Sequence, residues 1–254
     1  MTGPYFLGLD AGTSLIKAAI FDLGGRELAV AERPTTVHRP HPGWSEIDPS
    51  EAWTATTEVI ARAVRESGLD PGNIAGIGLS AAMVGAWLLD ADGMPLRRGI
   101  TWEDSRAQTL IDGYLAEDPA FLSRIFASSG SVMQQGCTLP VLAWLVRHEP
   151  DVLRRTRHIL CFKDYLRFRM TGRIATDRSE AAVLPGSARG RARSSDMISL
   201  FGLGPYEPLL PPIVDSEAVA GGLTAEAAVA TGLREGLPVA IGAGAVAATV
   251  IGAG

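Results

Sequence analysis

The sequence has few of the residues that build disulfide frameworks, metal centres or membrane spans. Only two cysteines, Cys137 and Cys161, occur in 254 residues, and neither belongs to a Cys-x-x-Cys pattern. This scarcity argues against a disulfide framework and against a zinc site. No run of about 18 apolar residues is available to cross a membrane. We therefore interpret both cysteines as buried free thiols and expect no membrane partner.

Positive charge is not in excess either. The chain has 23 Lys and Arg residues against 28 Asp and Glu residues, a net charge of -5, which disfavours a general nucleic-acid binder. The N-terminus lacks the basic, apolar leader of a secreted protein, so we expect a cytoplasmic location. A Walker A pattern is absent, and the Gly-x-Gly-x-x-Ala turn at 242–247 lacks the further strand and acid of a dinucleotide-binding unit.

What the sequence does contain is a pair of apolar runs within residues 6–22, joined by a small, hydroxyl-rich turn. The runs lack the 3.6-residue repeat of a helix, which favours two buried strands of a β-hairpin. Gly12 allows the backbone to approach a ligand, and Thr13 and Ser14 offer hydroxyl groups to it. The stretch therefore predicts a turn that holds a phosphate group.

Two charged residues flank this turn. Asp10 ends the first strand and would repel a phosphate group unless a cation such as Mg²⁺ lay between them. Lys17 interrupts an otherwise apolar strand and could add positive charge at the same place. In the alternative interpretation the hairpin is plain, Asp10 caps the turn and Lys17 extends into solvent. These residues alone leave both interpretations open.

The rest of the sequence predicts an α/β chain with 46% hydrophobic residues, enough for a large core. A Gly-Gly turn leads into a third strand at 27–31, which completes an antiparallel meander. Asp48 and Pro49 mark the start of a helix that Gly68 ends. Further elements follow in order: a strand at 74–80, a hairpin between 86–89 and 95–101, outer-layer elements, mainly helices, at 107–172, a helix at 224–230, and a strand at 238–241. We expect residues 1–254 to fold as one mixed-sheet domain around one core.

Residues 102–106 form a second polar cluster, Trp-Glu-Asp-Ser-Arg. An aromatic face beside two acids and a guanidinium group suits a polyhydroxylated ligand, because a sugar offers hydroxyls to carboxylates and C–H faces to an indole. In the alternative interpretation Asp104 caps a helix and forms a local ion pair with Arg106, which contributes little stability. Both interpretations stay open at this point.

Several motifs occur in the order found in one known family. They lie at residues 8–14, 43–49, 102–106, 163–166, 210–213 and 232–239. Together they resemble the N-terminal domain of the FGGY-family carbohydrate kinases, in the superfamily of actin, hexokinase and Hsp70 ATPases. The resemblance covers essentially the whole chain and implies a ribonuclease H-like (actin-like ATPase) domain. It also implies a sugar-binding cleft facing a second, C-terminal domain, absent from this chain, that closes over Mg-ATP.

The resemblance assigns roles to particular residues, with ATP and Mg²⁺ as the implied cofactors. Asp10 would hold Mg²⁺. The cofactor's transferred phosphoryl group would lie near Gly12, Thr13, Ser14 and Lys17. The small sugar or polyol substrate would contact Met83, Val84, Trp102, Glu103 and Asp104. The family's general base, an aspartate, would stand at position 245, where this sequence has Ala245.

The sequence departs from the family at several of these places. Ala82, Val84 and Val141 stand where relatives frequently have polar or charged residues, which predicts a more apolar sugar pocket. Ala245 is the most serious departure, because a methyl group cannot accept a proton. Loss of a general base typically costs about 10²- to 10⁴-fold in rate. With Ala245, Glu103 and Asp104 would be the nearby acids left to act as base.

Three functions are compatible with the sequence. The chain could be the substrate-binding half of an ATP-dependent sugar or polyol kinase, inactive by itself. It could be a kinase-like protein that binds sugar or regulates without phosphorylating. It could also be an actin-like or chaperone-like ATPase that shares only the fold. We favour the first, because the motifs at 43–49 and 102–106 serve a sugar site. Apolar surface left by the absent domain could also support a homodimer.

Overall fold

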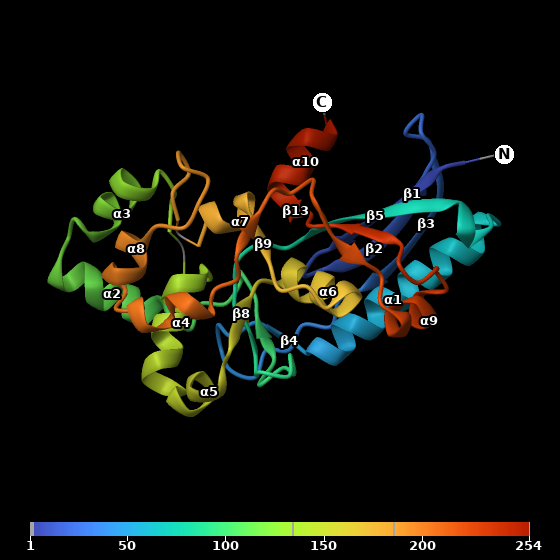
Figure 1. The fold of residues 1–254 in the computed structure, drawn as a ribbon. Coiled ribbons are helices and arrows are strands. Elements are labelled where there is room, and N and C mark those ends of the chain that lie inside the picture. The colour runs from blue at the N-terminus through green and yellow to red at the C-terminus, as the bar shows by residue number, and fades with distance from the viewer. Residues whose placement is uncertain (1–2, 134, 185, 254) are drawn as a thin grey trace.

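The computed structural model describes residues 3–133, 135–184 and 186–253, so residues 1 and 254, the expected ends of the domain, lie outside the described part. The protein has two parts side by side, one built on a large β-sheet and one mainly of helices (Figure 1). Two helices, α6 (Phe162–Thr171) and α7 (Arg178–Ala182), lie between them. The expected α/β class with a mixed sheet is confirmed.

The large sheet has seven strands of mixed direction. They are β1 (Tyr5–Ala11), β2 (Leu15–Phe21), β3 (Glu27–Pro34), β5 (Ile74–Ala81), β11 (Val219–Gly222), β12 (Pro238–Ala240) and β13 (Ala243–Gly244). Their order is β11-β12-β5-β1-β2-β3, with β13 also paired to β5. Strands β1, β2 and β3 form the expected antiparallel meander, whereas β5 runs parallel to β1, β12 and β13.

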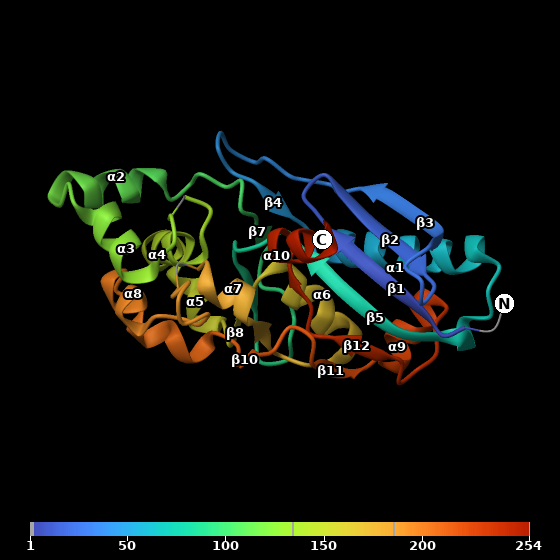
Figure 2. The same ribbon diagram turned by 90° about the horizontal axis from the view of Figure 1, so that it is seen from above.

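Helices cover the two faces of this sheet unequally. The helices that pack with it are α1 (Pro49–Ser67), α6, α9 (Ala225–Thr231) and α10 (Ala245–Ala253). Along β1, Leu7 and Leu9 are buried on the side of α1, while Asp10 is exposed on the other side. Figures 1 and 2 show α1 and α9 along one face and α10 standing over the opposite face. Asp10 therefore lies on the face that α1 leaves open.

The ends of α1 follow the expected capping pattern. Asp48 accepts hydrogen bonds from the backbone N–H groups of Ser50 and Glu51, and Pro49 occupies the first turn. Gly68 ends the helix in the left-handed conformation, with φ +65°. The buried stripe of the helix includes Ile60, which packs under the sheet. The predicted boundaries of this helix are confirmed.

The second part contains the remaining helices and three short two-stranded sheets. The helices are α2 (Gln108–Glu117), α3 (Phe121–Ser129), α4 (Thr138–His148), α5 (Pro150–Arg155) and α8 (Ser195–Leu200), with a 3-10 turn at Gly204–Leu209. A second 3-10 turn, Pro71–Asn73, belongs to the sheet part, between α1 and β5. The strand pairs are β4 (Glu46–Ile47) with β7 (Gly99–Ile100), β6 (Trp87–Leu89) with β8 (His158–Leu160), and β9 (Thr176–Asp177) with β10 (Ile213–Val214). Among the described residues, no helix combines the length and apolar character needed to cross a bilayer.

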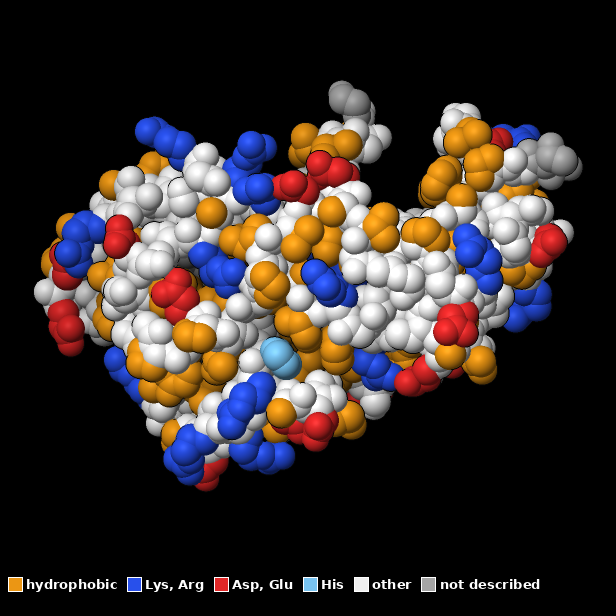
Figure 3. All heavy atoms as spheres, in the orientation of Figure 1, with side chains coloured by type: hydrophobic (Ala, Val, Ile, Leu, Met, Phe, Trp, Pro, Cys, Tyr) orange, Lys and Arg blue, Asp and Glu red, His pale blue; other side chains and the backbone are white. Residues whose placement is uncertain are grey.

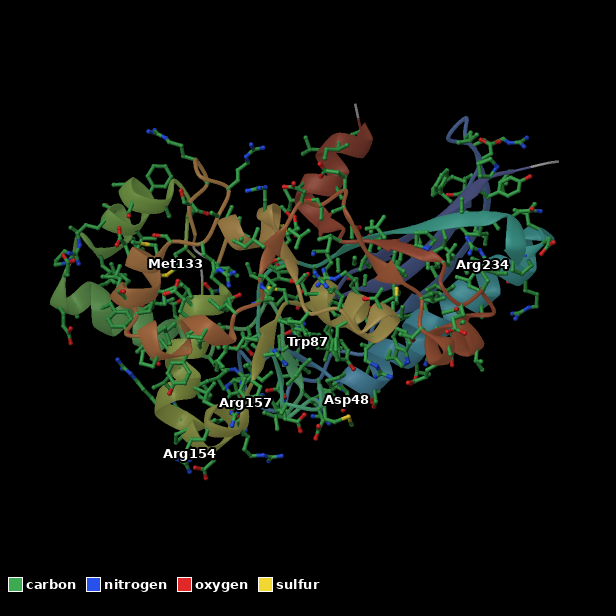
Figure 4. The ribbon with its side chains drawn as sticks, in the orientation of Figure 1. Asp48, Trp87, Met133, Arg154, Arg157 and Arg234 are labelled. Atoms are coloured by element: carbon green, nitrogen blue, oxygen red, sulfur yellow. The ribbon has the colours of Figure 1, made fainter. Side chains whose placement is uncertain are left out.

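The expectation of a single core is wrong, because the buried side chains form two clusters. Strand β6 separates them, since its successive side chains point to opposite sides. Trp87 belongs to the core under the sheet and stacks on Phe162 with ring centroids 4.7 Å apart, whereas Leu88 belongs to the helical core. Figure 4 shows Trp87 between the two parts of the protein.

Two further expectations need correction. The segments 86–89 and 95–101 do lie antiparallel, as expected, but they meet only at two isolated bridges, Ala86 with Ile100 and Leu89 with Pro95. Strand β6 forms its ladder with β8 instead, and β7 forms its ladder with β4. The segment that contains α6 is not an outer layer throughout. Lys163 and Arg167 on α6 are fully buried, because this helix fills the space between the two parts.

Candidate functional site

The register of the large sheet aligns five residues across its open face. Lys17 is paired with Glu32 on β3 and with Asp10 on β1. Asp10 is paired in turn with Ser80 on β5, and Ser80 with Ala243 on β13. The Ser80 hydroxyl donates to Asp10 Oδ1 at 2.6 Å, and the Lys17 ammonium lies 3.5 Å from a Glu32 carboxylate oxygen. Polar groups from separate strands therefore meet around Asp10.

The turn between β1 and β2 is held by hydrogen bonds from three directions. The Gly12 N–H donates to the Leu15 carbonyl oxygen at 2.8 Å, and the Thr35 hydroxyl donates to the Gly12 carbonyl oxygen at 2.8 Å. The Thr13 hydroxyl donates to Glu103 Oε1 at 3.1 Å. The turn is thereby tied both to β3 and to the segment after β7, at the end of the sheet where Asp10 lies.

A glycine-rich turn brings the start of α10 to the same end of the sheet. Gly242 has φ +80°, and a Cβ there would lie 2.2 Å from the Leu79 carbonyl oxygen, so only glycine fits. Gly244 makes room for Met83, whose Cε would lie 2.4 Å from a Cβ at that position. Because the turn packs this closely on the end of β5, Ala245 lies at the end of the sheet where Asp10 also lies.

These elements surround a cleft of about 1060 Å³. It brings together eight of the residues that the sequence assigned to the site, namely Asp10, Gly12, Thr13, Ser14, Met83, Val84, Trp102 and Ala245. Most of the other lining side chains are apolar, and they include Leu15, Ala82, Val132, Val183 and Val250. The cleft is large enough for a small sugar and a phosphoryl group.

Two assigned residues lie just outside this cleft. Lys17 lines a neighbouring groove of about 490 Å³, which it shares with Asp10. Glu103 stands behind the turn between β1 and β2, where its carboxylate accepts from the hydroxyl of Thr13 and, at 2.9 Å, from the guanidinium of Arg39. Both side chains therefore adjoin the cleft without lining it.

Asp104 does not contact the cleft, contrary to the role that the family resemblance implied, but the ion pair with Arg106 expected in the alternative interpretation is present. It is fully buried, and its carboxylate accepts from the Ser45 N–H at 2.7 Å and from Arg106 Nε at 2.8 Å. Burial would lower the pKa of Arg106, but hydrogen bonds to Asp104 and Glu46 outweigh this effect and raise it. The Arg106 guanidinium also lies 3.7 Å from the ring centre of Trp44. Asp104 is therefore not in the cleft, and it does not cap α2, which begins four residues later.

Of the three residues expected to make the pocket apolar, two line the cleft and one does not. Ala82 and Val84 line the cleft, as expected. Val141 does not, because its position on α4 faces the helical core, where it is fully buried. The apolar character of the cleft comes instead from residues after α3 and along α10.

Beneath the cleft lies a cluster of buried charges that the sequence analysis missed. Lys163 Nζ lies 2.6 Å from Asp164 Oδ1 and 3.1 Å from Asp177 Oδ1. Arg167 Nη1 lies 2.7 Å from Asp164 Oδ1, and Glu180 Oε2 accepts from a backbone N–H at 3.0 Å. All five side chains are fully buried. Three charges close together on one helix were a sign of such a network, but the sequence could not show that this helix is enclosed.

Burial and pairing shift the pKa values in this cluster in different directions. Burial would lower the pKa of Lys163, but Asp164 and Asp177 outweigh it and raise the pKa. Burial would raise the pKa of Asp177, but Lys163 and hydrogen bonds from Ser179 lower it. Burial raises the pKa of Glu180 to about 7, with Lys163 opposing. Since three carboxylates face two cations, Glu180 is the acid that holds a proton near neutral pH.

Comparison with known proteins agrees with this geometry. The sequence model of the FGGY family of carbohydrate kinases, N-terminal domain, matches residues 5–252. The chain belongs to the FGGY family. The suspected family is thus confirmed, and with it the ribonuclease H-like, actin-like fold that its structural neighbours share.

Relatives of this FGGY chain are named as sugar kinases. The xylulose kinase of Escherichia coli is 34% identical over 252 residues, which are 98% of this chain and 50% of that protein. A probable L-xylulose kinase of Haemophilus influenzae is 34% identical over 238 residues, 92% of this chain and 48% of that protein. The crystal structure of xylulose kinase from Rhodospirillum rubrum has a TM-score of 0.89 at 32% identity and matches 98% of this chain and 51% of that one. The FGGY chain thus spans about half the length of these relatives.

Replacing Glu180 by glutamine should change how the stability of this FGGY chain depends on pH. The pKa of Glu180 is raised to about 7 from its ordinary value of 4.5, so its contribution to stability is full below pH 4.5 and is lost as the pH rises through 7. Glutamine does not titrate. The free energy of unfolding of Glu180→Gln minus that of the wild type should therefore rise by about 1 kcal/mol from pH 6 to pH 8.

Urea unfolding at several pH values measures this difference. Glu226→Gln is the matched control, because Glu226 has an 80% exposed side chain on α9. Its difference from the wild type should not change with pH in this range. A Glu180→Gln difference that stays constant from pH 6 to pH 8 would show that Glu180 does not exchange its proton there.

Proposed function

We propose that this chain is the sugar-binding half of an ATP-dependent carbohydrate kinase that phosphorylates a small ketose or polyol. The cleft of about 1060 Å³ carries the proposal, because it gathers Asp10, Trp102 and Ala245 with the hydroxyl-rich turn in a member of the FGGY family. Relatives named as xylulose and L-xylulose kinases favour a ketopentose as the substrate class.

The groups that line the cleft suit different parts of this reaction. Trp102 is 45% exposed, and its indole offers an apolar face to the C–H side of a sugar. The Ser14 hydroxyl lies where it can donate to a phosphoryl group, and Gly12 lets that group approach the backbone. The Thr13 hydroxyl donates to Glu103, so it would have to leave this partner to donate to the phosphoryl group. Such a site accelerates phosphoryl transfer mainly by positioning the two reactants.

ATP and Mg²⁺ belong to the proposal as cofactors. Across the described residues, no group of three or more His, Cys, Asp and Glu side chains is arranged to hold a metal ion. Mg²⁺ in phosphoryl-transfer sites needs only one or two carboxylates, because waters and phosphate oxygens complete its shell. The exposed carboxylate of Asp10 fits this requirement, directly or through water. When bound, Mg-ATP supplies the phosphoryl group, and Lys17 adds positive charge nearby.

Position 245 supports a second candidate function. The family resemblance implies a general base at this position, whereas Ala245 offers the cleft only a methyl group. A protein that binds a sugar without phosphorylating it, as a sensor or regulator, is therefore the alternative. Neither Asp104, which is buried, nor Glu103, which is engaged behind the turn, lines the cleft as a replacement.

We propose in addition that the apolar face of α10 contacts the second half of the complete protein. Val246, Val250 and Ile251 are 70%, 69% and 79% exposed. Figure 3 shows apolar side chains on this projecting helix. The relatives are about twice as long as the chain, which is why their second half is the proposed partner. In isolation the same face could pair two copies as a homodimer.

A cytoplasmic location, where ATP is available, also belongs to the proposed function.

The isolated chain should bind sugar but bind Mg-ATP only weakly, because it provides only the phosphate side of a nucleotide site. Titration calorimetry with D-xylulose, L-xylulose and Mg-ATP measures both affinities. We expect heat of binding from a xylulose and little from Mg-ATP. Saturable Mg-ATP binding with a micromolar dissociation constant would contradict the proposal that this chain provides only the phosphate side of the nucleotide site. Absence of sugar binding would contradict the substrate class.

A further inference from the structure

Helix α7 lies between two walls of the cleft, namely the glycine-rich turn before Ala245 and the turn after β5. Its side chains accept a hydrogen bond from one backbone N–H group in each wall. The Ser179 hydroxyl accepts from the Gly244 N–H at 2.9 Å, and the neighbouring Glu180 carboxylate accepts from the Val84 N–H at 3.0 Å. These contacts join segments that are 65 and 96 residues distant in the sequence. Two successive side chains therefore fix the turn before Ala245 and the turn after β5 to one short helix.

The residue that Glu180 holds is in an unfavourable backbone conformation. Val84 has φ +57°, a left-handed conformation that β-branched residues rarely adopt. Such a conformation persists only where surrounding contacts enforce it. Thr138 Oγ1 donates to the Gly85 carbonyl oxygen at 2.7 Å and so holds the next residue, but the carboxylate of Glu180 holds the amide of Val84 itself. The shape of this cleft wall therefore depends on that contact.

The buried charges make α7 a rigid support. Asp177 caps α7, accepts from the Ser179 hydroxyl at 2.6 Å and pairs with Lys163 at 3.1 Å. On the other side, Arg167 donates to the Ile241 carbonyl oxygen at 3.1 Å, directly before the glycine-rich turn. Because this network is enclosed, α7 cannot shift without separating buried charges, which is costly. The positions of the two cleft walls are thus both set by α7.

We propose that Glu180 and Ser179 are positioning residues that set the spacing of the two cleft walls and thereby the fit of the sugar. Glu180 acts through the backbone of Val84 and does not touch the substrate, since it is fully buried. Ser179 acts through the backbone of Gly244, although it also lines the cleft. The inference rests on the proposed function only in naming a sugar as the ligand; the positioning of the two turns does not depend on it.

Site-resolved amide hydrogen exchange on the 254-residue chain tests the positioning directly. Glu180→Met keeps side-chain bulk but removes the acceptor, so exchange of the Val84 amide should accelerate by about tenfold or more, with the Gly244 amide little changed. Glu180→Gln should restore protection of Val84, because its amide oxygen can accept the same hydrogen bond. Ser179→Ala should produce the reverse pattern, with faster exchange at Gly244.

Each outcome decides the proposal. Unchanged exchange at Val84 in Glu180→Met would overturn it, and so would an equal acceleration of every amide, which signals general destabilisation. If Glu180→Met did not fold, Ser179→Ala would still test the proposal at the Gly244 amide, where unchanged exchange would overturn it. Glu226→Ala, on the exposed side of α9, is the matched control and should leave both amides unchanged.

Sugar binding provides a second readout. Titration with D-xylulose and L-xylulose should give an affinity for Glu180→Met about tenfold or more below that of Glu180→Gln. Equal affinities would contradict the role in sugar fit. If neither xylulose bound the wild-type chain, the substrate class would be wrong. The exchange experiment would still decide whether α7 positions the two turns.

Discussion

Replacing Ala245 by aspartate should raise the rate of sugar phosphorylation by about 10²- to 10⁴-fold, in a protein that joins this chain to the second half its relatives have. Ala245 lies in the cleft at the start of α10, at the end of the sheet where Asp10 also lies. A carboxylate there could accept the proton of the attacking sugar hydroxyl. In the proposed function Asp10 would not replace it, because its carboxylate would be committed to Mg²⁺.

A coupled assay of ADP formation with D-xylulose and L-xylulose measures the effect. Ala245→Asn is the matched control, because asparagine has the size of aspartate but cannot act as a base, and its rate should stay near that of the Ala245 protein. Equal rates for the Ala245 and Asp proteins would show that no base is needed at position 245. Glu103 would then be the acid to replace next, since it touches Thr13 at the edge of the cleft.

Much of the cleft could be predicted because local patterns determine it. The turn after β1 is built by Gly12 and the hydroxyl residues beside it, and the capping residue Asp48 and the left-handed Gly68 bound α1. The register of the meander then follows from short turns and from alternation along the strands. These features depend on residues close in sequence, so the sequence could place Asp10 beside the turn that it adjoins in the cleft.

Burial of charged groups could not be predicted in the same way. Asp104, Lys163 and Glu180 carry charged side chains, which are usually exposed or bind ligands. In this protein all three are fully buried, because segments far away in the sequence pack around them. Glu180, for example, bonds a residue 96 positions earlier. Val141 illustrates the same limit for an apolar residue, since the direction of α4 decides whether it faces the cleft or the helical core. Only the packing of the two parts fixes these directions.

The motif at 102–106 therefore divides into a part that lines or adjoins the cleft, Trp102 and Glu103, and a buried part, Asp104 and Arg106, which mutation should separate. Asp104→Ala should lower the free energy of unfolding by about 3–5 kcal/mol, because it leaves a buried arginine without one of its partners. Arg106 would keep only Glu46, at 2.7 Å, and the Ser45 N–H would lose its acceptor. Urea unfolding of the 254-residue chain measures the loss.

Glu103→Ala is the control within the same motif. The carboxylate of Glu103 is 26% exposed and pairs with Arg39, whose side chain is 59% exposed, so removing it should cost no more than about 1 kcal/mol. Asp104→Asn should fall between the two, because its amide oxygen can still accept from Ser45 but carries no charge for Arg106. If Asp104→Ala instead kept wild-type stability and lost affinity for xylulose, Asp104 would be a sugar ligand after all, and the cleft would have to open further than its present shape to expose it.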